Sequence, residues 1–126
     1  MSAVLAALVL ALAAAAPAPE VKMEGIGRTY LFDYGQMVIR VKYVSADTLT
    51  WEQVKGPQAG LKGEEKYGVS VVRPHVYFVW WQEKDTSIVT QVVDLEKKQV
   101  HTAWISPQKE LATFQGTIVP EPGGAP

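Results

Sequence analysis

The sequence predicts an all-β protein, a small antiparallel meander of about seven to nine strands closed into a barrel. Three observations predict it. After Glu24 the apolar residues recur with a period of two, turn-forming residues recur at short intervals, and no segment from Glu20 to Pro126 has helical periodicity. Closing the meander into a barrel removes exposed strand edges, and an open sandwich is the alternative.

The first clear alternation lies at residues 37–44. Met37, Ile39 and Val41 fall on one side of the expected strand, whereas Arg40 and Lys42 fall on the other. Six further strands are expected, at residues 48–53, 67–72, 76–82, 88–94, 100–105 and 113–119. Turn-forming residues separate these runs at 33–35, 45–47, 73–74, 83–85 and 96–98.

Hairpin pairing predicts which residues share a face. If Glu83 pairs with Ser87 and Asp94 pairs with Gln99, one face is apolar and aromatic with a few neutral polar groups. This face comprises Tyr77, Val79, Trp81, Val89, Gln91, Val93, Val100, Thr102 and Trp104. The opposite face carries Phe78, Trp80, Thr90, Asp94 and His101, and a slip of one residue would exchange the two sets.

Residues 56–65 break the alternation. The segment holds three glycines and one proline, which describes a mobile connection between strands. Two interpretations stay open: a lid at the mouth of a barrel, or an ordinary surface loop. Within it, Glu64 and Glu65 are expected to be a solvated pair rather than a catalytic acid and base.

Composition excludes several classes of function. A chain of 126 residues supports one domain, and a formal charge of −1 argues against nucleic acid as a partner. The absence of cysteine excludes disulfides, thiolate zinc, iron–sulfur clusters and a cysteine nucleophile. His75 and His101 cannot alone build a three-histidine metal site, so we expect no metal and no cofactor. No serine lies in a nucleophile-elbow pattern, and we expect no catalytic residues.

The two ends of the chain are expected to lie outside the domain. Residues 1–18 carry no charged side chain, and their apolar run followed by small residues resembles a secretory signal peptide. This predicts a periplasmic or secreted protein. The apolar run is shorter than the roughly 20 residues of a membrane-spanning helix, so no stable membrane insertion of the mature domain is expected. Residues 120–126 are rich in proline and glycine and predict a disordered tail.

Five short motifs carry a resemblance to a known family. They are RTYLFDYG at 28–35, LTWE at 49–52, GEEKY at 63–67, VYFVWWQE at 76–83 and VTQVVDLE at 89–96. In this order they resemble the MoaF-like family, named after molybdenum cofactor biosynthesis protein F. The resemblance implies a lipocalin-type (calycin) barrel over residues 25–119, around a small cavity. It implies no secure activity, and we do not carry over a role in molybdenum cofactor metabolism, because a leader would export the chain.

The neighbouring phenolic acid decarboxylases share a strand ending in Asp-x-Gly and a later Val-Tyr-x-Val-x-Trp-x-Glu strand. Their catalytic set is not retained in this chain. The first of two tyrosines matches Tyr30, but the second falls on Phe32, the arginine at or near Glu52 and the glutamate at or near Gly68. A glutamate in place of the arginine would repel a carboxylate substrate, so the resemblance argues against decarboxylation by that mechanism.

The aromatic residues suggest a ligand cavity. Four Trp and five Tyr can fill a barrel core, but a small barrel can also enclose one ligand among aromatic and neutral polar groups. The expected ligand-binding residues are Tyr30, Tyr43, Trp51, Tyr67, Trp81, Gln91 and Trp104. The first hypothesis is therefore an exported binding protein for a small, largely apolar or aromatic molecule. The alternatives are a lyase-like enzyme that uses Tyr30 with Glu52 or Gln91 on a small organic acid, and a structural or interaction domain without a ligand.

The outward face of the strand at 76–82 predicts self-association. Val76, Phe78 and Trp80 would form an exposed apolar row if Tyr77, Val79 and Trp81 face inward. A second copy could cover this row in an isologous homodimer. The alternatives are an inverted register, or a C-terminal segment folded across the row.

Overall fold

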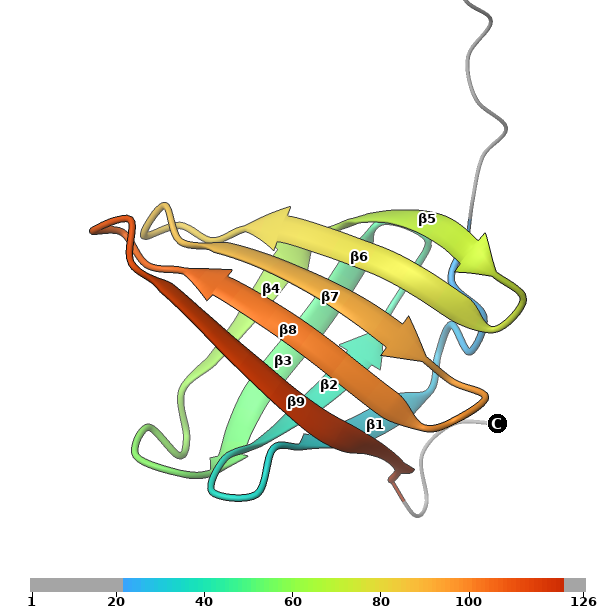
Figure 1. Ribbon diagram of the computed structural model, residues 1–126, viewed down its shortest axis with the longest axis horizontal. Coiled ribbons are helices and arrows are strands. Elements are labelled where there is room, and N and C mark those ends of the chain that lie inside the picture. Colours follow the sequence, from blue (N-terminus) through green and yellow to red (C-terminus); the bar gives the residue numbers. More distant parts are fainter. Residues whose placement is uncertain (1–21, 122–126) are drawn as a thin grey trace, which may run out of the picture.

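The computed structural model describes residues 22–121, which form one antiparallel sheet without helices (Figure 1). The strands are β1 (Thr29–Asp33), β2 (Val38–Tyr43), β3 (Thr48–Lys55), β4 (Lys62–Lys66), β5 (Gly68–Arg73), β6 (Val76–Gln82), β7 (Ile88–Asp94), β8 (Gln99–Ile105) and β9 (Leu111–Pro120). None of residues 22–121 belongs to a helix long and apolar enough to cross a membrane.

The sheet curls into a nearly closed barrel, which confirms the predicted fold class. The strand order is β4-β3-β2-β1-β9-β8-β7-β6-β5, so neighbouring strands are consecutive in sequence except where β1 pairs with β9. That pairing joins the two halves of the meander. The sheet stays open between β4 and β5, which follow each other in the chain but do not pair.

Two of the nine strands were not predicted from the alternation. β1 has apolar residues at three successive positions, Tyr30, Leu31 and Phe32, so a period of two is hard to see. β4 is the charged segment KGEEK, in which only Gly63 and Glu65 are partly buried. The expected mobile connection at 56–65 is therefore wrong in its second half, and the loop comprises residues 56–61. Glu64 and Glu65 lie on a strand and point to opposite faces.

The predicted register of β6, β7 and β8 is confirmed. Trp81 pairs with Val89, and Gln91 pairs with both Val79 and Thr102. Trp81 is 6% exposed whereas Trp80 is 40% exposed, so the apolar set faces the interior as expected.

Val76 departs from the expected outward row. A β-bulge between Val71 and Arg73 places two residues of β5 opposite one residue of β6 at the start of that strand. Val76, which pairs with the buried Asp94 of β7, is 4% exposed, so the exposed apolar row of β6 consists of Phe78 and Trp80.

One end of the barrel is closed by packed aromatic rings. Tyr43 makes edge-to-face contacts with Tyr30 and with Tyr67, at centroid separations of 6.3 Å and 5.6 Å. Met23 packs into the same core, and Gly25 lies so close to the Tyr30 hydroxyl that a Cβ there would clash with it. The segment before β1 therefore covers this end, to the right in Figure 1, where it is drawn in blue.

The C-terminal boundary of the domain lies later in the chain than the sequence predicts. β9 continues to Pro120, and the Glu121 carboxylate accepts hydrogen bonds from Arg40 of β2 at 2.8 Å and 3.0 Å. Pro120 and Glu121 thus belong to the barrel wall, although the sequence places both in the tail. The proposed signal peptide at 1–18 and residues 122–126 lie outside the described residues.

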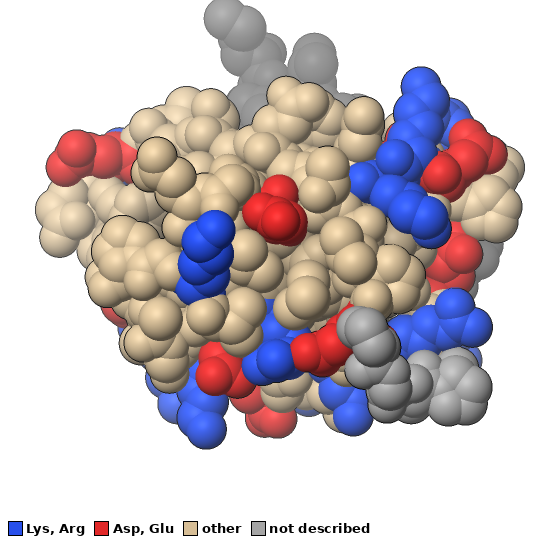
Figure 2. All heavy atoms as spheres, turned by 90° about the horizontal axis from the view of Figure 1, so that it is seen from below, with Lys and Arg blue, Asp and Glu red and all other residues tan. Residues whose placement is uncertain are grey.

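Charged side chains of both signs lie next to one another on the surface. Arg40 also contacts Glu52 at 3.2 Å, and Lys66 contacts Asp47 at 3.7 Å. Figure 2 shows the molecule from below, with lysines and arginines beside acidic groups at the lower and right margins and no broad basic area on that face.

Candidate ligand cavity

A cavity of about 380 Å³ opens at the end of the barrel opposite the tyrosine cluster. Its walls come from the β1–β2 turn, the inner faces of β2, β3, β6, β7, β8 and β9, the β3–β4 loop and the β6–β7 hairpin. In Figure 1 this is the left-hand end, where the β6–β7 and β8–β9 hairpins and the β3–β4 loop lie. The strand alternation turns apolar side chains of several strands into this space.

Three tryptophans dominate the cavity wall. Trp51 of β3, Trp81 of β6 and Trp104 of β8 all line it. Trp51 lies opposite Gly63 of β4, and a Cβ on Gly63 would lie 2.9 Å from the indole nitrogen. The absence of a side chain at Gly63 therefore gives the Trp51 indole the room it occupies.

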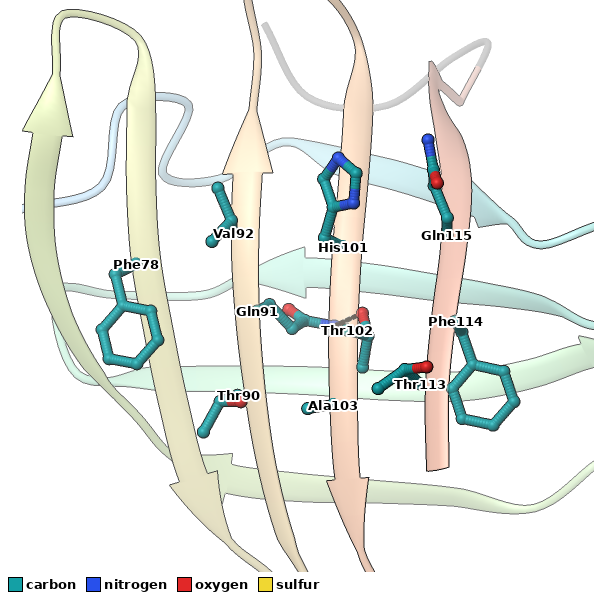
Figure 3. A pocket seen from close by; sticks show the side chains of 10 residues that line it. All are labelled: Phe78, Thr90, Gln91, Val92, His101, Thr102, Ala103, Thr113, Phe114 and Gln115. Carbon is teal, nitrogen blue, oxygen red and sulfur yellow. Dashed lines mark hydrogen bonds between the residues drawn. The ribbon is translucent and has the colours of Figure 1, made fainter. Parts of the chain in front are cut away.

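A small polar group lies deeper in the cavity. The Tyr34 and Thr102 hydroxyls are 2.7 Å apart and share a hydrogen bond, and Gln91 Nε2 donates to Thr102 Oγ1 at 3.3 Å. Figure 3 shows the bond between Gln91 and Thr102 on their neighbouring strands. Burial raises the pKa of Tyr34 to about 12, partly offset by its contacts with Thr102 and Gln91. Tyr34 is therefore a neutral hydroxyl at physiological pH.

Gln91 has one polar atom without a partner. The residue is 5% exposed, and its Oε1 makes no hydrogen bond within the part of the chain that the structure describes. A buried carbonyl oxygen in this state costs free energy. The cavity thus contains an unsatisfied hydrogen-bond acceptor.

Three carboxylates lie at or next to the cavity wall: Glu83 and Asp85 line it, and Glu65 contacts one of its tryptophans. The Trp51 indole donates to Glu65 Oε2 at 2.8 Å, and the Trp81 indole donates to Glu83 Oε2 at 3.1 Å. Burial raises the pKa of Glu65, and the bond from Trp51 partly offsets this shift. Hydrogen bonds from Ser87 lower the pKa of Asp85 on the β6–β7 hairpin.

The structure places four of the seven expected ligand-binding residues at this cavity: Trp51, Trp81, Gln91 and Trp104. The other three, Tyr30, Tyr43 and Tyr67, are at most 6% exposed and pack together at the closed end. They share the inner face with the cavity residues but lie at another height along the barrel. The strand period predicts the face of a residue and not this height.

Several cavity residues were not predicted. Tyr34 and Met37 belong to the β1–β2 turn, and Phe114 stacks edge-to-face on Tyr34 with centroids 5.9 Å apart. Glu83 and Asp85 lie in a hairpin that the sequence marks only as a turn. Turn-forming residues in the sequence mark these positions as hairpins. They do not show that the hairpins lie around the same opening.

The β3–β4 loop borders the mouth. Pro57, Gln58 and Leu61 line the cavity, and backbone hydrogen bonds join Gln53 to Gly60 and to Leu61, each at 2.8 Å. The position agrees with the lid interpretation. Whether the loop moves stays a prediction.

The residues of the enzyme hypothesis do not come together. Tyr30 is buried in the core and does not line the cavity, Glu52 faces outward and pairs with Arg40, and Gln91 alone of the three lines the cavity. His101 is exposed on the outer face of β8, as the pairing predicted. Among residues 22–121 no group of three His, Asp or Glu side chains is placed to hold a metal ion.

The fold and the cavity define a small antiparallel β-barrel with an interior of ligand size at one end. The chain belongs to the MoaF-like family, whose model matches residues 26–119, and this confirms the resemblance found in the sequence. No curated protein matches the chain significantly.

A solved structure from Burkholderia vietnamiensis, described as a "putative beta-lactamase", is similar in fold. The TM-score is 0.77 at 20% sequence identity, and the match covers 80% of this chain and 99% of the other. At this identity the similarity shows the shared barrel alone.

Proposed function

We propose that this protein binds a small, flat, largely apolar or aromatic molecule in the barrel cavity. The observation that carries the proposal is the cavity itself, with three indoles on its wall and a volume of about 380 Å³. Ligand sites in proteins range from about 300 to 1,000 Å³ and combine mostly apolar walls with a few polar groups. Gln91, Thr102 and Tyr34 supply such polar groups here.

Quenching of tryptophan fluorescence by a panel of small aromatic compounds tests the proposal. Binding in the cavity should quench the emission saturably, because three of the four tryptophans line the wall. Trp104→Phe should reduce the quenching, whereas the matched change Trp80→Phe on the outer face should leave it intact. The absence of a saturable response across the panel would favour the ligand-free structural domain instead.

We also propose that the protein is exported. The support is the uncharged, apolar and small-residue composition of residues 1–18. Expression of the full chain in a bacterial host, followed by mass spectrometry of the periplasmic and secreted fractions, tests this. A chain shortened at its N-terminus in those fractions is the expected result, and a full-length chain confined to the cytoplasm would contradict it.

We further propose that two copies associate through the outer wall of β6. Phe78 and Trp80 are 37% and 40% exposed, and their ring centroids lie 5.3 Å apart. Val71 and Val72 of the neighbouring β5 are more than half exposed. The adjoining shallow groove is lined without any Lys, Arg, Asp or Glu, and Figure 3 shows part of this outer wall. A twofold contact places a surface against itself, and an uncharged surface does so without repulsion.

A further inference from the structure

The side chains that line the cavity carry only negative charge. Glu83 and Asp85, both from the β6–β7 hairpin, are the charged members of the lining within residues 22–121, and no Lys or Arg contributes to it. Lys84 lies between them in the chain but is exposed and does not line the cavity. A positive group entering the mouth would therefore meet two carboxylates and no competing side-chain cation on the wall.

Hydrogen bonds hold these carboxylates in place. Glu83 accepts from the Trp81 indole at 3.1 Å, and the single hydroxyl proton of Ser87 is shared between Asp85 Oδ1 at 2.5 Å and Glu83 Oε1 at 3.0 Å. Asp85 accepts from the Ser87 backbone amide at 2.9 Å. Ser87 is fully buried, so the hairpin fixes both carboxylates at the rim rather than leaving them on free side chains.

The indole donors of two cavity tryptophans are already used. Trp81 donates to Glu83, and Trp51 donates to Glu65, whose carboxylate lies behind the rim on β4. These tryptophans therefore present their rings to the cavity rather than free N–H groups. The faces of aromatic rings are electron-rich and attract cations, most strongly for tryptophan.

An independent observation comes from the inner end of the cavity. Gln91 Oε1 is buried and has no hydrogen-bond partner among the described residues, while the Nε2 of the same amide is used by Thr102. Gln91 lies two residues further along β7 than Val89, the partner of Trp81, which is about 6.7 Å along the strand away from the β6–β7 hairpin. This oxygen can accept a hydrogen bond and donate none, so a ligand that reaches it needs a donor; because the oxygen has almost no exposed surface, the amide has to turn towards the ligand.

From these features we infer that the ligand is a small organic cation with a flat apolar body. Its positive group would lie near Glu83 and Asp85, its body between the indoles, and a hydrogen-bond donor at its far end would reach Gln91. An anion of the same shape would be repelled at the rim. The inference rests on the proposed function, because it specifies the ligand of that same cavity.

Three phenols of similar shape test the inference by isothermal titration calorimetry at pH 6.5. They are (4-hydroxyphenyl)trimethylammonium, its neutral isostere 4-tert-butylphenol, and the anion 4-hydroxybenzenesulfonate. Each offers a hydroxyl to Gln91, and the first two differ mainly by one positive charge. The cation should bind about tenfold more tightly than the isostere, and the anion should not bind measurably.

Two variants and a change of salt concentration assign the preference to the rim. The double variant Glu83→Gln/Asp85→Asn should lose the preference for the cation and keep the affinity for 4-tert-butylphenol. Glu64→Gln removes an acidic charge from the outward face of the same end and should keep the preference. With the unmodified protein, raising NaCl from about 20 to about 300 mM should weaken binding of the cation and leave that of 4-tert-butylphenol unchanged.

The outcomes separate this inference from the proposed function. Equal or tighter binding of 4-tert-butylphenol would overturn the inference and leave the proposed function standing. A cation preference that persists in the double variant and does not respond to salt would also overturn it. Binding of none of the three probes would overturn both.

Discussion

Tyr43 gives the sharpest test of the described core. Its side chain is fully buried, and its hydroxyl has no hydrogen-bond partner within residues 22–121. Burial raises the pKa of Tyr43 far above its ordinary value, with further contributions from the neighbouring tyrosines Tyr67, Tyr34 and Tyr30. The hydroxyl is therefore a neutral polar group whose burial is not compensated by a hydrogen bond to any of residues 22–121.

Replacing Tyr43 by phenylalanine should stabilise the protein. The change removes the unsatisfied hydroxyl and keeps the ring that packs against Tyr30 and Tyr67. An unpaired buried polar group costs about 1–3 kcal/mol, so we expect the free energy of unfolding to rise by about 1 kcal/mol. For a domain of about 100 residues this raises the melting temperature by about 4–8 °C.

Tyr67→Phe is the matched control in the same cluster. The Tyr67 hydroxyl donates to the Ser45 carbonyl at 2.7 Å, so its removal should lower the free energy of unfolding by about 1 kcal/mol. Urea unfolding followed by circular dichroism measures both variants, with the slope of the transition unchanged. If Tyr43→Phe destabilises as much as Tyr67→Phe, the Tyr43 hydroxyl has a partner and the reasoning is refuted.

Three further predictions concern surface, charge and pH. Trp80→Glu should give a folded monomer in sedimentation velocity, whereas Trp81→Glu should unfold the domain because the Trp81 side chain is 6% exposed. The reverse pattern would contradict the assignment of the two faces. An unmodified protein that is monomeric at high concentration would contradict the dimer. Because burial raises the pKa of Glu65, its ionisation opposes folding, so Glu65→Gln should raise the urea midpoint at pH 7, with the difference shrinking below about pH 4.5. An equal difference at both pH values would argue against burial as the cause. Since Tyr34 ionises at about pH 12 in the fold and about pH 10 when unfolded, the free energy of unfolding should fall steadily above pH 10; a flat profile to pH 11.5 would contradict its burial.

The sequence predicts the β6–β8 region in detail because each strand pairs with the strand that follows it in the chain. Short turns on either side of Ile88–Asp94 leave little freedom for slippage, and a buried face penalises a slip of one residue. The inward set from Tyr77 to Trp104 followed from this pairing alone. The pairing did not predict that Val76 is buried, because it gives the side of the strand and not what covers that side.

The cavity was predicted only in part because it depends on distant contacts. Pairing of β1 with β9 brings Tyr34 beside Phe114, and no local pattern encodes that contact. The sequence does not separate the tyrosine cluster from the cavity residues, for a related reason. Met23 and the segment before β1 close that end of the barrel, whereas the hairpin at Glu83 leaves the other end open. Which end is open depends on the packing of the whole chain.

The indole N–H resonances of the tryptophans give the most direct test of the central claim, that a flat ligand binds inside the open end of the barrel. The protein has four tryptophans, of which Trp51, Trp81 and Trp104 line the cavity and Trp80 faces outward. In a proton–nitrogen correlation spectrum titrated with (4-hydroxyphenyl)trimethylammonium, the three cavity resonances should shift saturably with one dissociation constant, and that of Trp80 should stay in place. Cavity resonances that stay in place both with this cation and with 4-tert-butylphenol, or a response of Trp80 alone, would contradict the account.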